Sequence, residues 1–302
     1  MINFENRVVP WNSLGKKVKN DKINNIVKQA GLDWNVEQHD VYINSKKAYG
    51  YKANVRDNDE TILGIVSSKY QVIQNEQAFS FIDELIDEGL ELESAGELKN
   101  GKRVWLMSKL PDIFIADDEI TPYICFINNH DGKGGVRVAV TPIRVACANA
   151  LNIAINQAYR SWSTKHMGNI ENKIEEAKRT LNFTQKYIYK FQEKGNELIN
   201  KKIDKNDVEE LTAKLVPFPE QDKLTERKKV NIEEKRQELL YHYNNAPDLE
   251  GIRDTAWGFL NAVSSFALHA RPKRETKTYQ SRLFERVLNG HNVIDNAYKL
   301  VA

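Results

Sequence analysis

The spacing of apolar residues along the chain changes from a two-residue period to a period of three to four. Residues 34–42, WNVEQHDVY, alternate apolar and polar side chains for part of their length, and 52–56 and 61–73 continue this strand-like pattern. Ahead of them lie four apolar residues at helical spacing and a glycine stop: Ile23, Ile26, Val27, Ala30 and Gly31. The chain is therefore predicted to open with a short helix and a β-meander.

The next forty residues predict one helix and one hairpin. Asn75 is a natural N-cap, Gly89 marks a helix end, and the apolar positions between them share one helical face: Ala78, Phe79, Ile82, Leu85 and Ile86. Apolar runs at 92–98 and 103–110 then flank Asn100-Gly101. Because Asn-Gly favours a tight two-residue turn, this pattern predicts a β-hairpin.

Two more strands are predicted at 123–128 and 136–140, joined through a turn at His130-Asp131-Gly132. Past Arg144 the apolar pattern becomes helical through Ala158.

The rest of the chain is predicted to be helical. Residues 171–245 look helical, with a break at Pro217 and Pro219, and the highly charged stretch 223–236 is either a solvated helix or a mobile loop. Residues 256–268 form an apolar helix. Strands cluster first and helices follow, which favours an α+β fold over a doubly wound sheet. We expect an α+β core domain with an antiparallel or mixed sheet over residues 1–165. An α-helical region over 166–302 would pack on that core or extend from it.

Composition places the chain among ordinary globular proteins. Of 302 residues, 41% are hydrophobic and 28% are charged, with a formal net charge of +2, so total charge alone does not indicate a polyanionic partner. Both cysteines, Cys125 and Cys147, lie in apolar surroundings, which favours free thiols in a reducing compartment. The first residues lack the apolar core of a signal peptide, and no apolar run is long enough to span a membrane. We expect a cytoplasmic protein.

The distribution of charge is more informative than its total. Residues 133–170 contain no acidic residue, and a second basic strip lies at 271–286. Lysine and arginine neutralise phosphates, and exposed aromatic rings stack on the bases of single strands. The candidate nucleic-acid-binding residues are Arg137, Arg144, Tyr159, Arg160, Trp162, Lys165, Arg271, Lys273, Arg274, Lys277 and Arg282. The alternative is that these are two ordinary solvated faces, with Tyr159 and Trp162 in the core.

Candidate chemistry centres on the turn between the predicted strands. His130 and Asp131 could form a catalytic or metal-binding turn, although His-Asp-Gly is more typical of a β-turn in which Asp131 bonds its own backbone. The following Lys133-Gly134-Gly135 could cradle a phosphate through backbone amides, but it is a short signal. No nucleotide-binding, nucleophile-elbow or metalloprotease motif is present, so no cofactor is expected.

A zinc site would need four separate residues to converge. Cys125, His130, Cys147 and His166 are the candidates, and none of them has the paired spacing of zinc ligands. We expect no metal site.

Several short segments carry a family resemblance. They are Pro10-Trp11, Leu14-Gly15, Gly64-Ile65-Val66, Lys69-Tyr70, Asn75, His130-Asp131-Gly132, the run from Thr141 to Leu151 (TPIRVACANAL), Ala256-Trp257-Gly258 and Asn261-Ala262-Val263. Together they resemble the phage/plasmid-like protein family, which occurs on phages, prophages and plasmids. The family usually has valine and threonine where this chain has Ala146 and Ala150, which argues against a chemical role for either position. The resemblance implies a mobile-element protein acting inside a bacterial host cell.

These observations lead to three hypotheses of function. The first is a homo-oligomeric DNA-metabolism protein that binds single-stranded DNA without sequence preference and anneals strands in recombination or replication. Phage annealing proteins, with a similar order of strands and helices, are the fold-level analogy for it. The second is a protein–protein module that inhibits a host defence or replication complex, with the acidic segment 76–119 as a docking surface. The third is a metal-dependent hydrolase or nuclease that uses His130, Asp131 and His166.

Overall fold

An eight-stranded antiparallel sheet forms the centre of the molecule. The computed structural model describes residues 9–151, 161–164, 170–220, 225–270 and 276–302. The main path of the sheet runs β1-β5-β6-β8-β9-β10, with β7 paired to β8 and β11 to β9. Its strands are β1 (Gly15–Lys17), β5 (Glu91–Leu98), β6 (Arg103–Lys109), β7 (Ile113–Ile115), β8 (Asp118–Asn129), β9 (Val136–Arg144), β10 (Asn149–Ala150) and β11 (Ser161–Thr164).

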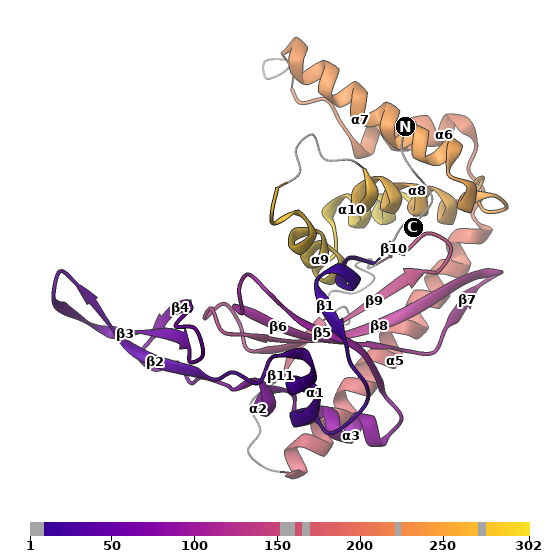
Figure 1. Ribbon diagram of the computed structural model, residues 1–302. Helices are drawn as coiled ribbons and strands as arrows, with labels where there is room; N and C mark the ends of the chain where they lie inside the picture. Colours follow the sequence, from indigo (N-terminus) through magenta and orange to yellow (C-terminus); the bar gives the residue numbers. More distant parts are fainter. Residues whose placement is uncertain (1–8, 152–160, 165–169, 221–224, 271–275) are drawn as a thin grey trace.

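A second sheet of three strands projects from this body (Figure 1). Its strands are β2 (Val36–Ile43), β3 (Lys46–Arg56) and β4 (Ile62–Ser67), paired antiparallel in the order β2-β3-β4. Asn44 and Ser45 join β2 to β3 with positive φ angles of 47° and 66°, as a tight two-residue hairpin turn requires. We call this sheet, residues 36–67, the arm.

The predicted hairpin at Asn100-Gly101 is confirmed. Strands β5 and β6 pair from Glu91↔Lys109 to Leu98↔Arg103. The connecting residues Lys99, Asn100 and Gly101 all have positive φ, which asparagine and glycine tolerate at low cost.

The prediction of one helix over residues 75–90 is wrong in two respects. Two short helices, α2 (Asn75–Phe79) and α3 (Ile82–Asp87), replace it, because Phe81 turns into the core, where its ring lies 5.8 Å from that of Phe126. Asn75 is not the N-cap, because Gln74 takes that position and donates its backbone N–H to the Gln77 side chain at 3.2 Å. Asn75 is buried instead, at 2% exposure.

The helical prediction past Arg144 is also wrong where the structure describes the chain. Residues 145–148 form a turn, and β10 then pairs with β9 through Asn149↔Arg144 and Ala150↔Ile143. Ala148 has a positive φ of 52°, which ends any helical continuation there. The remainder of that predicted helix lies outside the described residues.

Helices dominate the second half of the chain, as predicted, and the fold is α+β. They are α5 (Ile170–Asn200), α6 (Lys205–Leu215), α7 (Glu226–Asn245), α8 (Ala256–His269), α9 (Tyr279–Asn289) and α10 (Asn292–Val301), preceded in the chain by α1 (Ile23–Ala30) and with the 3-10 turns η1 (Pro10–Ser13) and η3 (Pro247–Leu249). In the described part of the chain, none of these helices is long and apolar enough to cross a membrane.

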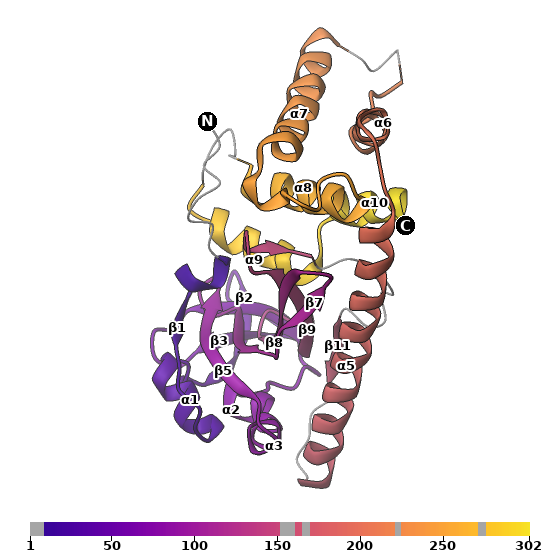
Figure 2. The ribbon, with the colours of Figure 1, turned by 90° about the vertical axis from the view of Figure 1, so that its right-hand side faces the viewer.

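The helices cover both faces of the central sheet (Figures 1 and 2). Phe284 of α9 packs on Trp105 with ring centroids 4.9 Å apart, while Phe81, beside α3, packs on Phe126. Because Phe126 lies opposite Leu106, the neighbour of Trp105, these contacts are on opposite faces of the pleat. A buried apolar cluster runs continuously from the sheet into α5, α8, α9 and α10.

Candidate nucleic-acid interface

The arm exposes large apolar and aromatic side chains to an unusual degree. Tyr49 is 84% exposed, Tyr42 60% and Tyr51 57%. Three isoleucines of the arm are also more than half exposed: Ile43, Ile62 and Ile65. Exposed apolar side chains that gather on one element mark surfaces that bind something, because a monomeric protein gains nothing by keeping them in water.

The inner half of the arm has one face on the body and one face in solvent. Across its strands Asn54 lies opposite both Gln38 and Gly64, whereas the neighbouring Ala53 lies opposite both His39 and Ile65. Asn54 is completely buried, and Ile65 is 53% exposed. Because side chains alternate between faces, the face that holds Ile65 points away from the body.

Lysines accompany the tyrosines near the tip of the arm. Tyr42 lies opposite Lys47, whose Nζ stands 5.9 Å from the centre of the Tyr49 ring, and Lys46 is exposed beside them. Asp40 is the nearest acid. Hydrogen bonds from the ammonium groups of Lys47 and Lys52 lower the pKa of Asp40 to about 2. One carboxylate is thus shared by two lysines, and together with Lys46 the cluster keeps a net positive charge. Cationic side chains therefore lie beside exposed aromatic rings.

The turn at His130-Asp131-Gly132 supports the base of the arm. Asn54 donates its side-chain N–H to the carbonyl of His130 at 2.8 Å. A Cβ on Gly64 would lie 2.8 Å from the Cα of Asp131, and one on Gly132 would lie 2.9 Å from Val66, so glycine is needed where turn and strand touch. Several segments that carry the family resemblance thus meet at this one contact.

His130 is buried and held in place by its neighbours. Its Nε2 lies 2.9 Å from the Oδ1 of Asn75, whose own amide nitrogen donates to the carbonyl of Leu32. The ring of Trp34 packs edge-on against the imidazole at 5.3 Å. Burial lowers the pKa of His130 to about 4, against the opposing effect of Asp131, so the ring is neutral at pH 7. Asp131 bonds the backbone N–H of Lys133 at 3.0 Å. This hydrogen bond of an aspartate to the backbone two residues on is that of a β-turn, the alternative to a catalytic or metal-binding turn. The geometry gives His130 a structural role.

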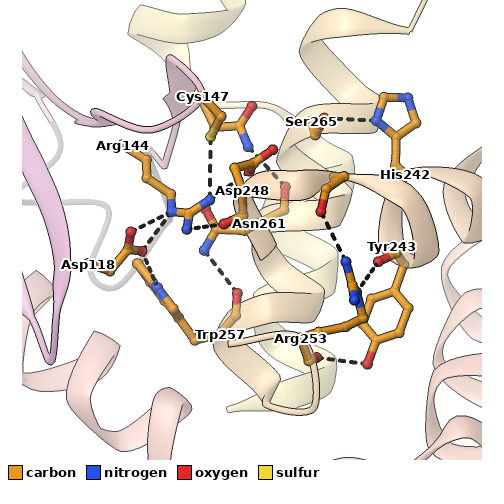
Figure 3. Close-up of polar contacts among 12 residues, drawn as sticks. Asp118, Arg144, Cys147, His242, Tyr243, Asp248, Arg253, Trp257, Asn261 and Ser265 are labelled. Carbon is orange, nitrogen blue, oxygen red and sulfur yellow. Dashed lines mark hydrogen bonds and ion pairs between the residues drawn. The ribbon is translucent and has the colours of Figure 1, made fainter. Parts of the chain in front are cut away.

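Arg144 lies in the interior and not on a surface. Its side chain is 4% exposed, and its Nε lies 2.7 Å from Asp118 while its Nη1 lies 2.7 Å from Asp248 (Figure 3). Trp257 donates its indole N–H to the same Asp118 at 2.8 Å. The Sγ of Cys147 lies 3.7 Å from the guanidinium. One network of charged groups therefore joins four elements of the fold: β8, β9, η3 and α8.

The assignment of Arg144 as a phosphate contact is corrected by this geometry. Two carboxylates already take up the directed hydrogen bonds of its guanidinium, and a buried arginine needs such partners. The adjacent motif residues serve the same junction, since Asn149 donates to the carbonyl of Asn261 and Ser264 to that of Ala150. The Thr141–Leu151 run thus joins the sheet to α8.

Arg137 of the first basic cluster contacts α9, the helix that carries Arg282 of the second. Its Nη1 donates to the Oδ1 of Asn289 at the end of α9, the helix that also presents Arg282 at its exposed surface. Lys277 is exposed just ahead of this helix. Trp162 pairs through its backbone with Val138 in β9. The other predicted contacts lie outside the described residues: Tyr159, Arg160, Lys165, Arg271, Lys273 and Arg274.

Among the described residues, no three His, Cys, Asp or Glu side chains are grouped so as to hold a metal ion. Burial raises the pKa of Cys147 to about 12 and that of Cys125 higher still, so both thiols stay protonated. His166, the remaining member of the proposed zinc set, lies outside the described residues.

The sequence pattern did not single out the arm as a candidate binding surface. Strands were predicted at 34–42, 52–56 and 61–73, so the outer part of β3, which carries Tyr49 and Tyr51, was in no predicted strand. A tyrosine near a strand is also more typical of a core residue unless the strand is known to project. The available signal was composition, since residues 42–52 combine three tyrosines with three lysines and contain no acid.

The fold and this surface together define an α+β protein with a projecting aromatic arm. The chain belongs to the family described as domain of unknown function (DUF932), which matches residues 62–288. No curated protein and no solved structure matches the chain.

Proposed function

We propose that this protein binds single-stranded DNA without sequence preference and that the arm is its principal contact. The observation that carries this proposal is the joint exposure of Tyr42, Tyr49 and Tyr51 beside Lys46 and Lys47. Every base has a flat face that can stack on an aromatic ring, so such a platform is tolerant of sequence. Lysines beside the rings would neutralise the phosphates that link successive bases.

Arg137, Lys277 and Arg282 would extend this contact along the body. Arg137 of β9 donates a hydrogen bond to Asn289 of α9, and the turn that precedes β9 also supports the arm. A strand leaving the arm would meet these cations next. Arg144 has no part in the proposal, because it is buried.

The resemblance of the short motifs to the phage/plasmid-like protein family supports a role in a mobile genetic element, acting in the cytoplasm of a bacterial host cell. A protein that coats single strands there would serve recombination or replication. Annealing of two complementary strands, by an assembly of several copies, is the specific activity we propose. A strand-annealing assay with the purified protein tests this finer step separately from binding.

The decisive experiment is a fluorescence anisotropy titration of a labelled oligothymidine at low salt, where phosphate contacts are strongest. The variant Tyr42→Ala/Tyr49→Ala/Tyr51→Ala is expected to bind at least roughly tenfold more weakly, since one stacked base contributes about 1–3 kcal/mol. Tyr189→Ala is the matched control, because Tyr189 is 69% exposed on α5, outside the arm. Absence of binding by the wild type, or an equal loss in both variants, would refute the proposal.

Protein docking is the second candidate function, and the exposed isoleucines favour it. Ile43, Ile62 and Ile65 offer aliphatic contacts that a nucleic acid does not need. If the arm docks a protein, Ile62→Ser/Ile65→Ser abolishes capture of that partner, while oligothymidine does not compete with it. Competition by the oligonucleotide would instead favour the first function.

A further inference from the structure

A cavity of about 180 Å³ lies between the central sheet and α9, close to the base of the arm. One wall is a single face of the sheet. Arg103 lies opposite Asn129, and Trp105 lies opposite Ile127, which in turn lies opposite Arg137. Opposed residues share a face, so these side chains all point toward α9. The second wall is α9 itself, and the turn 133–135 closes one side.

The lining of this cavity is dominated by groups that donate hydrogen bonds. Arg103, Lys133 and Arg137 are cationic, and Glu285 is the one carboxylate among the lining residues. The charge of Glu285 is already paired twice, with Lys99 at 2.7 Å and with Arg103. The cavity therefore keeps an excess of positive charge.

Two of the lining side chains carry buried N–H groups that have no hydrogen-bond partner among the described residues. They are the Nε of Arg103 and the Nε1 of Trp105. A buried donor without a partner costs free energy, so such groups are rare unless a water or a ligand satisfies them. Both side chains belong to the lining of the cavity, and a small shift of either would turn its N–H toward a bound acceptor.

The turn 133–135 adds backbone groups to the same cavity. Gly134 and Gly135 line it without side chains, and the Asn129 amide fixes the turn by donating to the Gly135 carbonyl at 2.9 Å. A Cβ on Gly135 would meet no heavy atom within 4 Å, so the backbone here is open. Loops of this kind bind oxyanions through their N–H groups.

We propose that this cavity is a binding site for a phosphoryl group. A ligand that only accepts hydrogen bonds and carries negative charge matches the cations, the two unpartnered donors and the glycine turn together. The cavity volume of about 180 Å³ is large enough for a phosphoryl group. One water molecule needs about 10–15 Å³ of such volume, and a phosphoryl group has only a few times as many heavy atoms. The group comes either from a free phosphate compound or from the terminal phosphate of a nucleic-acid strand.

The test uses the full-length protein and two kinds of probe. Inorganic phosphate is added during thermal unfolding, with sodium chloride at matched ionic strength as the reference, because a ligand of the folded state raises its unfolding temperature. Separately, oligothymidines with a 5′-phosphate, a 3′-phosphate or only hydroxyl ends are compared by anisotropy. Phosphate protection without a preference among ends identifies a free compound as the source. Tighter binding of one phosphorylated end identifies the strand terminus.

Two variants of lining residues, with one control, test whether the phosphate effect or the end preference arises at this cavity. Lys133→Gln removes an exposed cation from its lining and is expected to weaken phosphate binding by roughly three- to tenfold, the loss of one charge-assisted contact. Lys235→Gln, on the exposed face of α7, is the matched control and is expected to change nothing. Arg103→Gln should weaken binding further, with its unfolding temperature checked first because Arg103 pairs with Glu285.

The proposal is overturned if phosphate gives no protection beyond chloride and the three oligonucleotides bind alike. It is also overturned if Lys133→Gln and Lys235→Gln behave the same. Failure of the proposed single-strand function leaves a different signature, in which no oligonucleotide binds while phosphate still protects the wild type.

Discussion

Arg144 of β9 and Asp248 of η3 lie 104 residues apart in the chain, yet the Nη1 of the arginine donates to the Oδ2 of the aspartate at 2.7 Å. Asp118 accepts a hydrogen bond from the Nε–H of the same guanidinium. The side chains of all three residues are at most 10% exposed. Removal of one partner from such a group leaves the others charged and buried.

Replacement of Arg144 by methionine is therefore expected to lower the free energy of unfolding by about 3–5 kcal/mol. Urea denaturation followed by circular dichroism measures it. Arg144→Lys should recover only part of the loss, because an ammonium group does not reach two carboxylates as a guanidinium fork does. Arg227→Ala, at an exposed position of α7, is the control and should stay within about 0.5 kcal/mol of wild type. Equal effects of Arg144→Met and Arg227→Ala would contradict the buried network.

Stability is expected to fall as the pH drops below neutrality, in part through His130. Its pKa is about 4 in the folded protein, and that of an unfolded histidine is about 6.5. Between these values the unfolded chain binds the proton first, so the contribution of His130 is complete above pH 6.5 and is lost as the pH falls through 4. It is on the order of 3 kcal/mol.

Urea titrations at several pH values measure this contribution by comparison of variants. His130→Gln should flatten the dependence between the two pKa values. The assignment fails if the wild-type slope survives in His130→Gln.

Gly64→Ala is expected to disturb the base of the arm. The new methyl group would lie 2.8–3.0 Å from the backbone of Asp131, so strand or turn must move, at a cost of about 1–3 kcal/mol. Hydrogen exchange should show faster exchange in β3 and β4, and limited proteolysis should cut there first. Gly135→Ala is the matched control, because its Cβ meets nothing within 4 Å. Identical protection patterns in the two variants would contradict the predicted contact.

Removal of charge at the arm tip is expected to change the salt dependence of binding. Each phosphate contact to a single strand contributes about −0.7 to the slope of log K against log salt concentration. Lys46→Gln/Lys47→Gln should thus make the slope shallower by up to about 1.4, with the free energy of unfolding nearly unchanged. Lys229→Gln/Lys235→Gln on α7 should keep the wild-type slope. An unchanged slope in the arm variant would exclude these lysines as phosphate contacts.

Local signals in the sequence predicted local structure well. The Asn100-Gly101 hairpin, the α1 stop at Gly31 and the apolar helix after Thr255 depend on turn chemistry and spacing within a few residues, and all three are present. The α+β order of strands before helices was likewise predictable, because it follows from the change of period.

The sequence predicted the wrong role for residues whose partners are distant in the chain. Arg144 looked like a surface cation because the acids that pair with it, Asp118 and Asp248, lie outside the acid-free window. Asn75 looked like a helix cap because its true partner, His130, is 55 residues away. A single sequence gives no sign of such pairings, and only the packing of the chain creates them.

The Arg144 network also decides how this chain can be divided. A fragment that stops at residue 165 would keep Arg144 and Asp118 but would lose Asp248 and Trp257. Arg144 would then lack its second carboxylate, Asp118 would lack the indole N–H, and both side chains would face solvent. Neither half is expected to survive as a separately expressed piece. The sheet and the helices share one buried apolar cluster, so each is expected to depend on the other for its stability.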